Sequence, residues 1–313
     1  MTNVAEFVTP DGDDANYRIL DLRSNALEAE DVAGWARRQV VPVIGVTGDR
    51  ISQAADELDL LVSGDDEAGA LCDRIDAAPM AAAVLVQVTR TTVQLPIADA
   101  LVVESLGYAT LQGGAEFQCW LRDNERPQSR EIEEPVRLDR QDDVLRIILV
   151  SPENRNAFSA AMRDGLTEAF RLVALDDSIR QVIVEGEGPC FSAGGDLSEF
   201  GSMKDLAEAH RIRQLSMPAR YLAKNADRYV FRLHGACIGA GIELPAFAAR
   251  VEATSDAWFQ LPEVGMGLIP GAGGCVSIPR RIGRQRTNEL AITGRKLSVQ
   301  EALDWGLVDA IVS

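Results

Sequence analysis

The 313-residue sequence lacks the features that mark membrane-spanning, secreted and zinc-binding proteins. No apolar run reaches the roughly 18 residues that a membrane span needs. The N-terminal stretch MTNVAEFVTPDGDD has neither the charged nor the apolar region of a signal peptide. The five cysteines are odd in number and show no CxxC or other ligand spacing, so we expect no disulfide framework and no metal site. These absences predict a protein of the reducing cytoplasm.

Positive charge is also scarce. The chain has 31 Lys and Arg against 48 Asp and Glu, a net charge of −17. Residues 1–67 hold 15 of the acidic residues and only 5 of the basic ones. Such a surface repels nucleic acid, and no basic stripe offsets it. Any anionic ligand must therefore be bound by backbone N–H groups and a few arginines.

Short apolar runs alternate with helical patterns, which predicts an α/β fold. We expect strands at 17–22, 40–46, 58–63, 144–150, 181–186 and 229–234. Helices are expected near 27–38, 51–57 and 159–175, and a helical stretch at 67–126 has breaks at Pro79, Pro96 and Gly113-Gly114. In its longest helix one apolar face is formed by Ile97, Leu101, Tyr108 and Leu111, extended by Val102, Leu106 and Ala109.

Composition divides the chain further. Residues 123–136 are charged and contain two prolines, which indicates a linker. We therefore expect an N-terminal α/β segment at 1–66, a helical region at 67–126 and a layered α/β core at 137–313.

The first of three glycine-bearing motifs is Gly194-Gly195-Asp196, which follows the strand expected at 181–186. Two glycines let a ligand approach the backbone amides closely. A helix beginning at Asp196 or Leu197 would aim unpaired N–H groups at that ligand. Considered alone, the motif fits an ordinary turn capped by Asp196 better.

The second motif, Gly239-Ala240-Gly241, follows the strand at 229–234 and opens a helix with Glu243 in its first turn. Free N–H groups at a helix N-terminus favour developing negative charge. In isolation, Glu243 is equally an ordinary N-terminal helix acid, and His234 at the strand end suits a structural role.

The third motif places Glu263 directly after Pro262, where a fixed turn can hold a carboxylate beside a pocket. The glycines at 271–274 lack the Lys-Ser/Thr of a phosphate loop and the spacing of a dinucleotide fingerprint. They predict a tight turn into a helix.

Together these motifs are similar to those of a known family. Residues 137–313 resemble the crotonase, or enoyl-CoA hydratase/isomerase, superfamily. The resemblance rests on blocks in the family's order: SPENRNAFS at 151–159, FSAGGD at 191–196, HGACIGAGIE at 234–243, LPE at 261–263, IPGAGG at 269–274, ITGR at 292–295 and ALDWGLVD at 302–309. It implies the family's layered ββα spiral core.

The resemblance also implies the site. The N–H groups of Gly195 and Ala240 would form the hole for a thioester oxygen, and an alanine serves there because only its amide is used. Glu243 and Glu263 match the two catalytic glutamates of hydratases. Ala193, Asp196 and Gly239 would contact the substrate, and Arg155 a CoA phosphate.

The implied activity is hydration of a 2-enoyl-CoA by the two glutamates, without a metal or redox cofactor. A Δ3,Δ2-enoyl-CoA isomerase, which needs only one carboxylate, and a non-catalytic acyl-CoA-binding subunit are the alternatives. The family resemblance further implies a homo-oligomer built on a trimer. The acyl chain is not specified by the sequence.

The C-terminal region of the family matches residues near the start of this chain. Family members continue beyond the position of Ser313 into several helices. Residues 60–67 resemble the segment that follows the family's Gly-Leu-Val stretch, 68–79 its next helix and 97–121 its final helix. We therefore expect a circular permutation, which exposed and adjacent termini permit. An unrelated N-terminal domain covering the same surface is the alternative.

Overall fold

The computed structural model describes residues 4–9, 14–23, 27–48, 53–125, 127–128 and 134–312. Its N-terminal part is a four-stranded sheet in the order β1-β2-β3-β4, parallel except for the β1–β2 pair. The strands are β1 (Val8–Thr9), β2 (Arg18–Asp21), β3 (Val43–Val46) and β4 (Leu60–Val62). Helix α1 (Ala29–Ala36) and a 3-10 turn (Gln53–Glu57) complete a small core with this sheet. The three strands expected in this segment are confirmed.

Four helices follow in series. They are α2 (Asp65–Ala77), α3 (Pro79–Thr92), α4 (Ile97–Gln112) and α5 (Ala115–Asp123), and they break at the prolines and glycines as predicted. Pro79 begins α3 because a first-turn residue needs no N–H donor. On α4, Leu106 is 51% exposed, so its place in the predicted apolar face was wrong. The buried face is Leu101, Glu104, Tyr108 and Leu111, a spacing of three or four residues.

The C-terminal part contains a six-stranded sheet in the order β13-β10-β8-β7-β6-β5. All neighbours are parallel except the hairpin of β5 and β6. The strands are β5 (Val136–Gln141), β6 (Val144–Leu149), β7 (Gln181–Gly186), β8 (Tyr229–Leu233), β10 (Arg250–Thr254) and β13 (Ala310–Val312). A second sheet pairs β9 (Ala236–Ile238), β11 (Trp258–Gln260) and β12 (Leu297–Ser298). This is the layered α/β core expected from the sequence.

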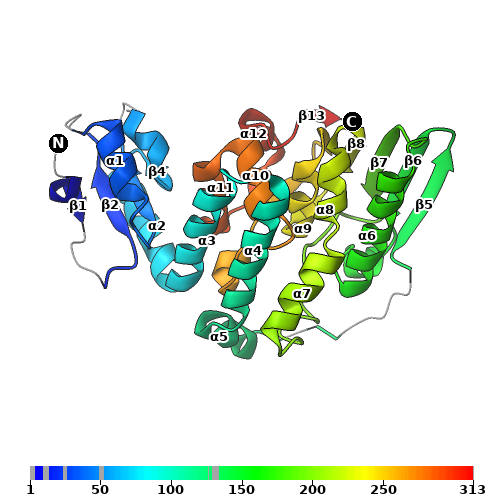
Figure 1. Ribbon diagram of the computed structural model, residues 1–313, viewed down its shortest axis with the longest axis horizontal. Helices are drawn as coiled ribbons and strands as arrows, with labels where there is room; N and C mark the ends of the chain where they lie inside the picture. The colour runs from blue at the N-terminus through cyan, green and yellow to red at the C-terminus, as the bar shows by residue number, and fades with distance from the viewer. Residues whose placement is uncertain are drawn as a thin grey trace.

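Helices pack around these sheets. They are α6 (Ala160–Leu175), α7 (Leu206–Ser216), α8 (Ala219–Leu222), α9 (Ala240–Glu243), α10 (Gly274–Ile282), α11 (Arg284–Thr293) and α12 (Val299–Trp305). Helix α6 begins where Ser159 caps it by accepting the Met162 N–H. Figure 1 shows the four-stranded sheet at one end of the molecule, the six-stranded sheet at the other, and α3, α4 and α10 between them.

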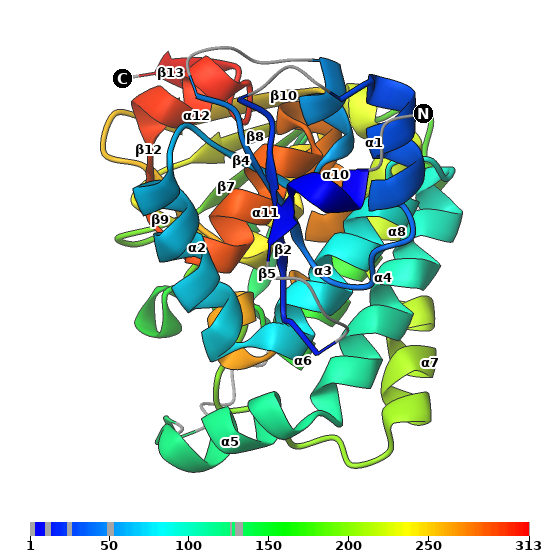
Figure 2. The same ribbon diagram turned by 90° about the vertical axis from the view of Figure 1, so that its left-hand side faces the viewer.

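The N-terminal helices share a single apolar core with the C-terminal part. Leu85, Leu101 and Tyr108 belong to the same buried cluster as Phe170 and Phe259. Helix α3 packs against α10 and α11, and Figure 2 shows α11 between α2 on one side and α3 and α4 on the other. The residues between α5 and β5 that the structure describes carry neither helix nor strand. Within the described residues, no helix is long and apolar enough to cross a bilayer.

A buried ion network joins the N-terminal sheet to both sets of helices. Asp59, next to β4, accepts from Arg90 of α3 (Nε–Oδ1 2.8 Å) and from Arg284 of α11. Its Oδ2 also accepts the Val43 N–H at 2.9 Å. The Asp59 side chain is only 1% exposed, so these partners offset the free energy of desolvating its charge.

Candidate active site

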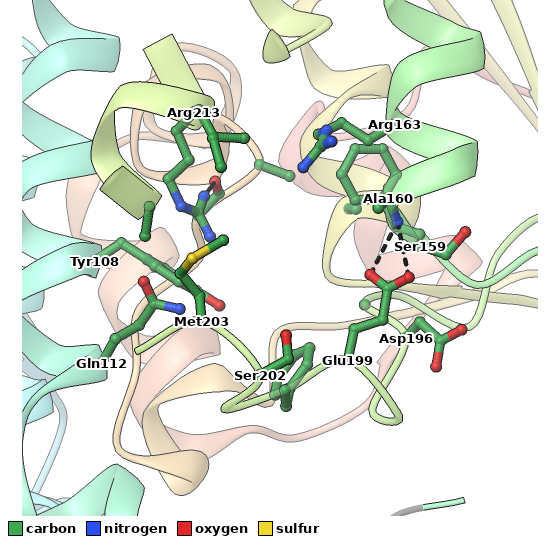
Figure 3. Close-up of a pocket in the computed structure, with 18 of the residues that line it drawn as sticks. Tyr108, Gln112, Ser159, Ala160, Arg163, Asp196, Glu199, Ser202, Met203 and Arg213 are labelled. Atoms are coloured by element: carbon green, nitrogen blue, oxygen red, sulfur yellow. Dashed lines mark hydrogen bonds between the residues drawn. The ribbon is translucent and has the colours of Figure 1, made fainter. Parts of the chain in front are cut away.

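A cavity of about 520 Å³ opens where α4, α6 and α7 meet the loops that follow the strands. Figure 3 shows Tyr108, Gln112 and Met203 on one side of it and Ser159, Arg163 and Glu199 on the other. The predicted residues Gly195, Asp196, Ala240, Glu243 and Glu263 all line this cavity, together with Phe117, Phe158, Phe200, Ile212, Arg213 and Met217. The chain thus brings together five of the eight residues selected from the sequence.

The segments that contain Gly195 and Ala240 lie side by side because they pair like strands. Ser192 donates to Ala236 O at 3.2 Å, and Ile238 donates to Ser192 O at 3.0 Å. Gly194 has φ +86°, and a Cβ there would lie 2.9 Å from Ile238 O, so only glycine allows this approach. Within the described part of the chain, neither the Gly195 nor the Ala240 N–H donates to another protein group. Two free donors therefore line the cavity wall.

The first motif is not followed by a helix, which corrects the prediction of one beginning at Asp196 or Leu197. Asp196 Oδ1 instead accepts from Ser198 N at 2.9 Å and from Ser198 Oγ at 2.6 Å. This local turn satisfies the amide that a helix start would leave free. The next helix, α7, begins only at Leu206, where Asp205 caps it.

Glu243 and Glu263 converge over Gly239. Glu243 is 2% exposed, and its Oε2 accepts from Ala272 N at 2.7 Å and from Gly274 N at 2.9 Å. A Cβ on Gly239 would lie 3.6 Å from Oε1 of Glu243 and 2.5 Å from Oε1 of Glu263. A side chain at position 239 would clash with the carboxyl group of Glu263, so glycine is needed there. Oε2 of Glu263 is buried without a hydrogen-bond partner among the described residues.

The surroundings of the two carboxyl groups give them different pKa values. Burial raises the pKa of Glu243 to about 7, while the Ala272 and Gly274 N–H groups and Arg213 oppose that rise. Burial, followed by the charge of Glu243, raises the pKa of Glu263 well above its usual range. Near neutral pH this arrangement supports a partly ionised Glu243 beside a Glu263 that holds its proton more strongly.

Sequence reasoning missed a third buried carboxylate, Glu104 of α4. Its Oε1 accepts from Gly273 N at 2.7 Å and its Oε2 from Cys275 N at 2.9 Å. Burial, and then the charge of Glu243, raises the pKa of Glu104. One signal was present in the sequence, since Glu104 stands in the apolar register of Leu101, Tyr108 and Leu111.

Arg213 of α7 was also missed. Its guanidinium lies 3.7 Å from the centroid of the Tyr108 ring, and Nη1 donates to Gly271 O at 2.5 Å. Both contacts place a cation at the cavity wall near Glu243. No spacing in the sequence links α4, α7 and the 271–275 turn, so this contact depends on the tertiary fold.

The remaining predicted residues lie elsewhere. Gly239 lies beneath the two carboxyl groups rather than on the cavity wall. Ala193 donates to Arg155 O at 2.9 Å, and neither residue lines the cavity, the Arg155 side chain being exposed. His234 contacts Gly188 O at 3.0 Å, in keeping with a structural role. In the described ranges, no three His, Cys, Asp or Glu side chains are grouped as metal ligands.

Comparisons with known proteins agree with this geometry. Residues 139–313, more than half of the chain, match the sequence profile described as enoyl-CoA hydratase/isomerase. The mitochondrial Delta(3,5)-Delta(2,4)-dienoyl-CoA isomerase of Rattus norvegicus is 36% identical over 55% of this chain and 56% of its own. The 2,3-dehydroadipyl-CoA hydratase of Escherichia coli is 33% identical over 56% of this chain and 68% of its own.

A solved structure is similar over the same region. A Thermobifida fusca protein in complex with acetoacetyl-CoA superposes with a TM-score of 0.54 at 26% identity, covering 58% of this chain and 74% of that one. The chain thus spans little more than half of the rat relative and about three quarters of this structure.

Proposed function

The chain belongs to the enoyl-CoA hydratase/isomerase family, and on that premise we propose that it is an enoyl-CoA hydratase. It adds water across the 2,3 double bond of an acyl-CoA thioester. One observation carries the proposal: two buried carboxyl groups, Glu243 and Glu263, converge over Gly239 beside two free backbone donors. Hydration needs two proton-transfer groups, whereas a simple double-bond shift needs one.

The proposed reaction begins with the thioester oxygen bound by the N–H groups of Gly195 and Ala240. These donors stabilise the enolate-like charge, and losing one such donor typically costs about 2.7–4 kcal/mol of transition-state stabilisation. Glu243 removes a proton from water as the oxygen attacks Cβ. Glu263 then delivers its proton to Cα, so one molecule of water is added and no electron carrier is required.

The resting protonation supports this division of roles. The pKa of Glu243, raised by burial to about 7, leaves about half of the Glu243 side chains ionised in neutral solution and thus able to accept a proton. Glu263, whose pKa burial raises further, retains the proton that Cα needs.

Isomerisation is the competing activity, because the relatives include both a dienoyl-CoA isomerase and a hydratase. Crotonyl-CoA separates the two: a hydratase removes its conjugated-enoyl absorbance, and a 3-enoyl-CoA isomerase produces that absorbance from a 3-enoyl-CoA. We expect loss of absorbance with crotonyl-CoA. Turnover of the 3-enoyl substrate alone would contradict the proposal.

Glu243→Gln is the matched variant for this assay. Both backbone bonds of Glu243 go to one oxygen, so the glutamine carbonyl can retain them. We expect the variant to fold normally and to lose roughly 10²–10⁴-fold in kcat. If the chain were a non-catalytic acyl-CoA-binding subunit, neither the wild type nor Glu243→Gln would turn over crotonyl-CoA, and both would bind the CoA thioester equally well.

We further propose that α2–α5 correspond to the family's C-terminal helices, placed before the catalytic core. Support comes from the apolar core that α3 and α4 share with the catalytic part.

A cytoplasmic location is supported by the five free cysteines. A homo-oligomer, either a trimer or a dimer of trimers, follows from the family resemblance and can be checked by light scattering.

A further inference from the structure

Glu104 and Glu243 bind the same turn from opposite sides. Glu243 accepts the N–H groups of Ala272 and Gly274, and Glu104 those of Gly273 and Cys275. The four donors alternate along consecutive residues at the N-terminus of α10. The turn therefore cannot shift without breaking bonds to one of the two carboxylates.

The two carboxylates use their oxygens differently. Glu243 engages only Oε2, which leaves Oε1 beside Glu263 above Gly239. Glu104 engages one N–H with each oxygen and does not line the large cavity. Both oxygens of Glu104 accept from backbone N–H groups, so neither is directed at a substrate.

Neighbouring contacts fix the turn in the same place. A Cβ on Gly271 would lie 2.2 Å from the Tyr108 ring, and Arg213 holds the Gly271 carbonyl. Gly273 has φ +107°, and a Cβ there would lie 2.5 Å from Phe247. Because there is so little free space around the turn, a shift of α4 would move the turn and with it the carboxylate of Glu243.

We propose that Glu104 is a positioning residue for the reaction. By holding the 272–275 turn, it sets the position and charge environment of Glu243, although it does not touch substrate. The N-terminal helical region thus supplies part of the catalytic apparatus. This inference rests on the proposed role of Glu243 as the base.

Glu116 offers a matched control within the same helical region. Its Oε1 accepts from Met80 N at 2.7 Å and its Oε2 from Ala81 N at 3.0 Å, the same one-bond-per-oxygen pattern at the start of α3. Glu116 does not line the cavity. Glutamine at either position replaces one acceptor oxygen with an NH₂ group that faces an N–H donor. Glu104→Gln and Glu116→Gln thus make the same local change at different places.

The test measures kcat and KM for crotonyl-CoA, with thermal unfolding to verify folding. We expect Glu104→Gln to lower kcat roughly 10- to 100-fold, with KM unchanged, and Glu116→Gln to retain wild-type kcat. Equal kcat values for the two variants, or a loss of kcat accompanied by a comparable rise in KM, would overturn the proposal.

Glu104→Asp tests the reach of the side chain and replaces the first variant if that one does not fold. The shorter side chain keeps the carboxyl group but cannot span both amides, so kcat should fall with KM unchanged. A kcat equal to that of Glu116→Gln would overturn the positioning role. Glu243→Gln distinguishes the two proposals. If this variant keeps full activity, Glu243 is not the base and the proposed function is contradicted. If it is inactive while the Glu104 variants have normal activity, only the positioning role of Glu104 is contradicted.

Discussion

At the scale of single residues, the site depends on carboxyl groups that are buried but not equivalent. Glu243 has two N–H donors on one oxygen, whereas Oε2 of Glu263 has no partner among the described residues. Donors favour the ionised form and their absence favours the protonated form. The backbone N–H groups around the two carboxyl groups thus give them different tendencies to ionise, as the proposed base and acid require.

Stability should depend on pH through Glu243. Burial raises its pKa from 4.5 to about 7 on folding. Stabilisation from such a group is complete below the unfolded pKa and is lost as pH rises through the folded pKa. Relative to Glu243→Gln, the wild-type free energy of unfolding should fall by at most about 3 kcal/mol over this range. Urea unfolding of both proteins from about pH 4 to about pH 8 checks this window, and parallel curves would contradict it.

Gly239→Ala should disturb both structure and catalysis. The residue has φ +49°, and a methyl group would meet Oε1 of Glu263 at 2.5 Å. We expect a loss of about 1–3 kcal/mol in the free energy of unfolding and a large fall in kcat.

Gly265→Ala is the control for that substitution, since Gly265 has no positive φ and a Cβ there would meet nothing within 4 Å. Thermal unfolding and crotonyl-CoA turnover measure both variants. Equal stability and equal turnover of the two alanine variants would show that glycine is not required at position 239.

At the scale of elements, the loop after Gly195 and helix α7 deliver Arg213 to the cavity. Asp205 caps α7 by accepting from Ala207 N at 3.0 Å and Glu208 N at 3.1 Å. No helix forms at the predicted position 196, where Asp196 accepts from Ser198 in a local turn. The start of α7 is therefore set by Asp205, nine residues further along.

Asp205→Ala should weaken α7 by about 1 kcal/mol, because two first-turn N–H groups lose their acceptor. Asp205→Asn keeps an acceptor oxygen and should remain close to the wild type. Chemical denaturation of the two variants measures the difference. Indistinguishable midpoints would mean that this cap does not stabilise the helix.

At the scale of the whole molecule, residues from α3 and α4 complete the core of the catalytic part. Glu104 accepts from Gly273, 169 positions away, and the ring of Tyr108 packs against Arg213 of α7. Removing this region would expose the apolar residues that it covers and release the 271–275 turn.

Deletion of residues 1–130 should accordingly leave an insoluble core, because a large exposed apolar surface promotes aggregation. Expression of residues 131–313 with measurement of soluble yield and turnover tests this. A soluble fragment with full activity would contradict both the shared core and the permuted arrangement that we propose.

Element types, helix breaks and the local motifs were accessible from the sequence because they depend on neighbouring residues. Apolar patterns located β2, β3, β4, β6, β7 and β8 but not the other strands, Pro79 and Gly113-Gly114 marked the helix ends, and Gly195, Ala240, Glu243 and Glu263 were selected from their motifs. All four line one cavity. Local patterns suffice for such features, since caps, turns and amphipathic faces are set within a few residues.

Only the tertiary structure decided how distant segments meet. It placed Glu104 across the turn from Glu243, stacked Arg213 on Tyr108 and left Leu106 in solvent. It also gave Glu243 and Glu263 different surroundings. The physical reason is that burial and charge coupling depend on what surrounds a group in space, and sequence spacing does not encode contacts across 169 positions.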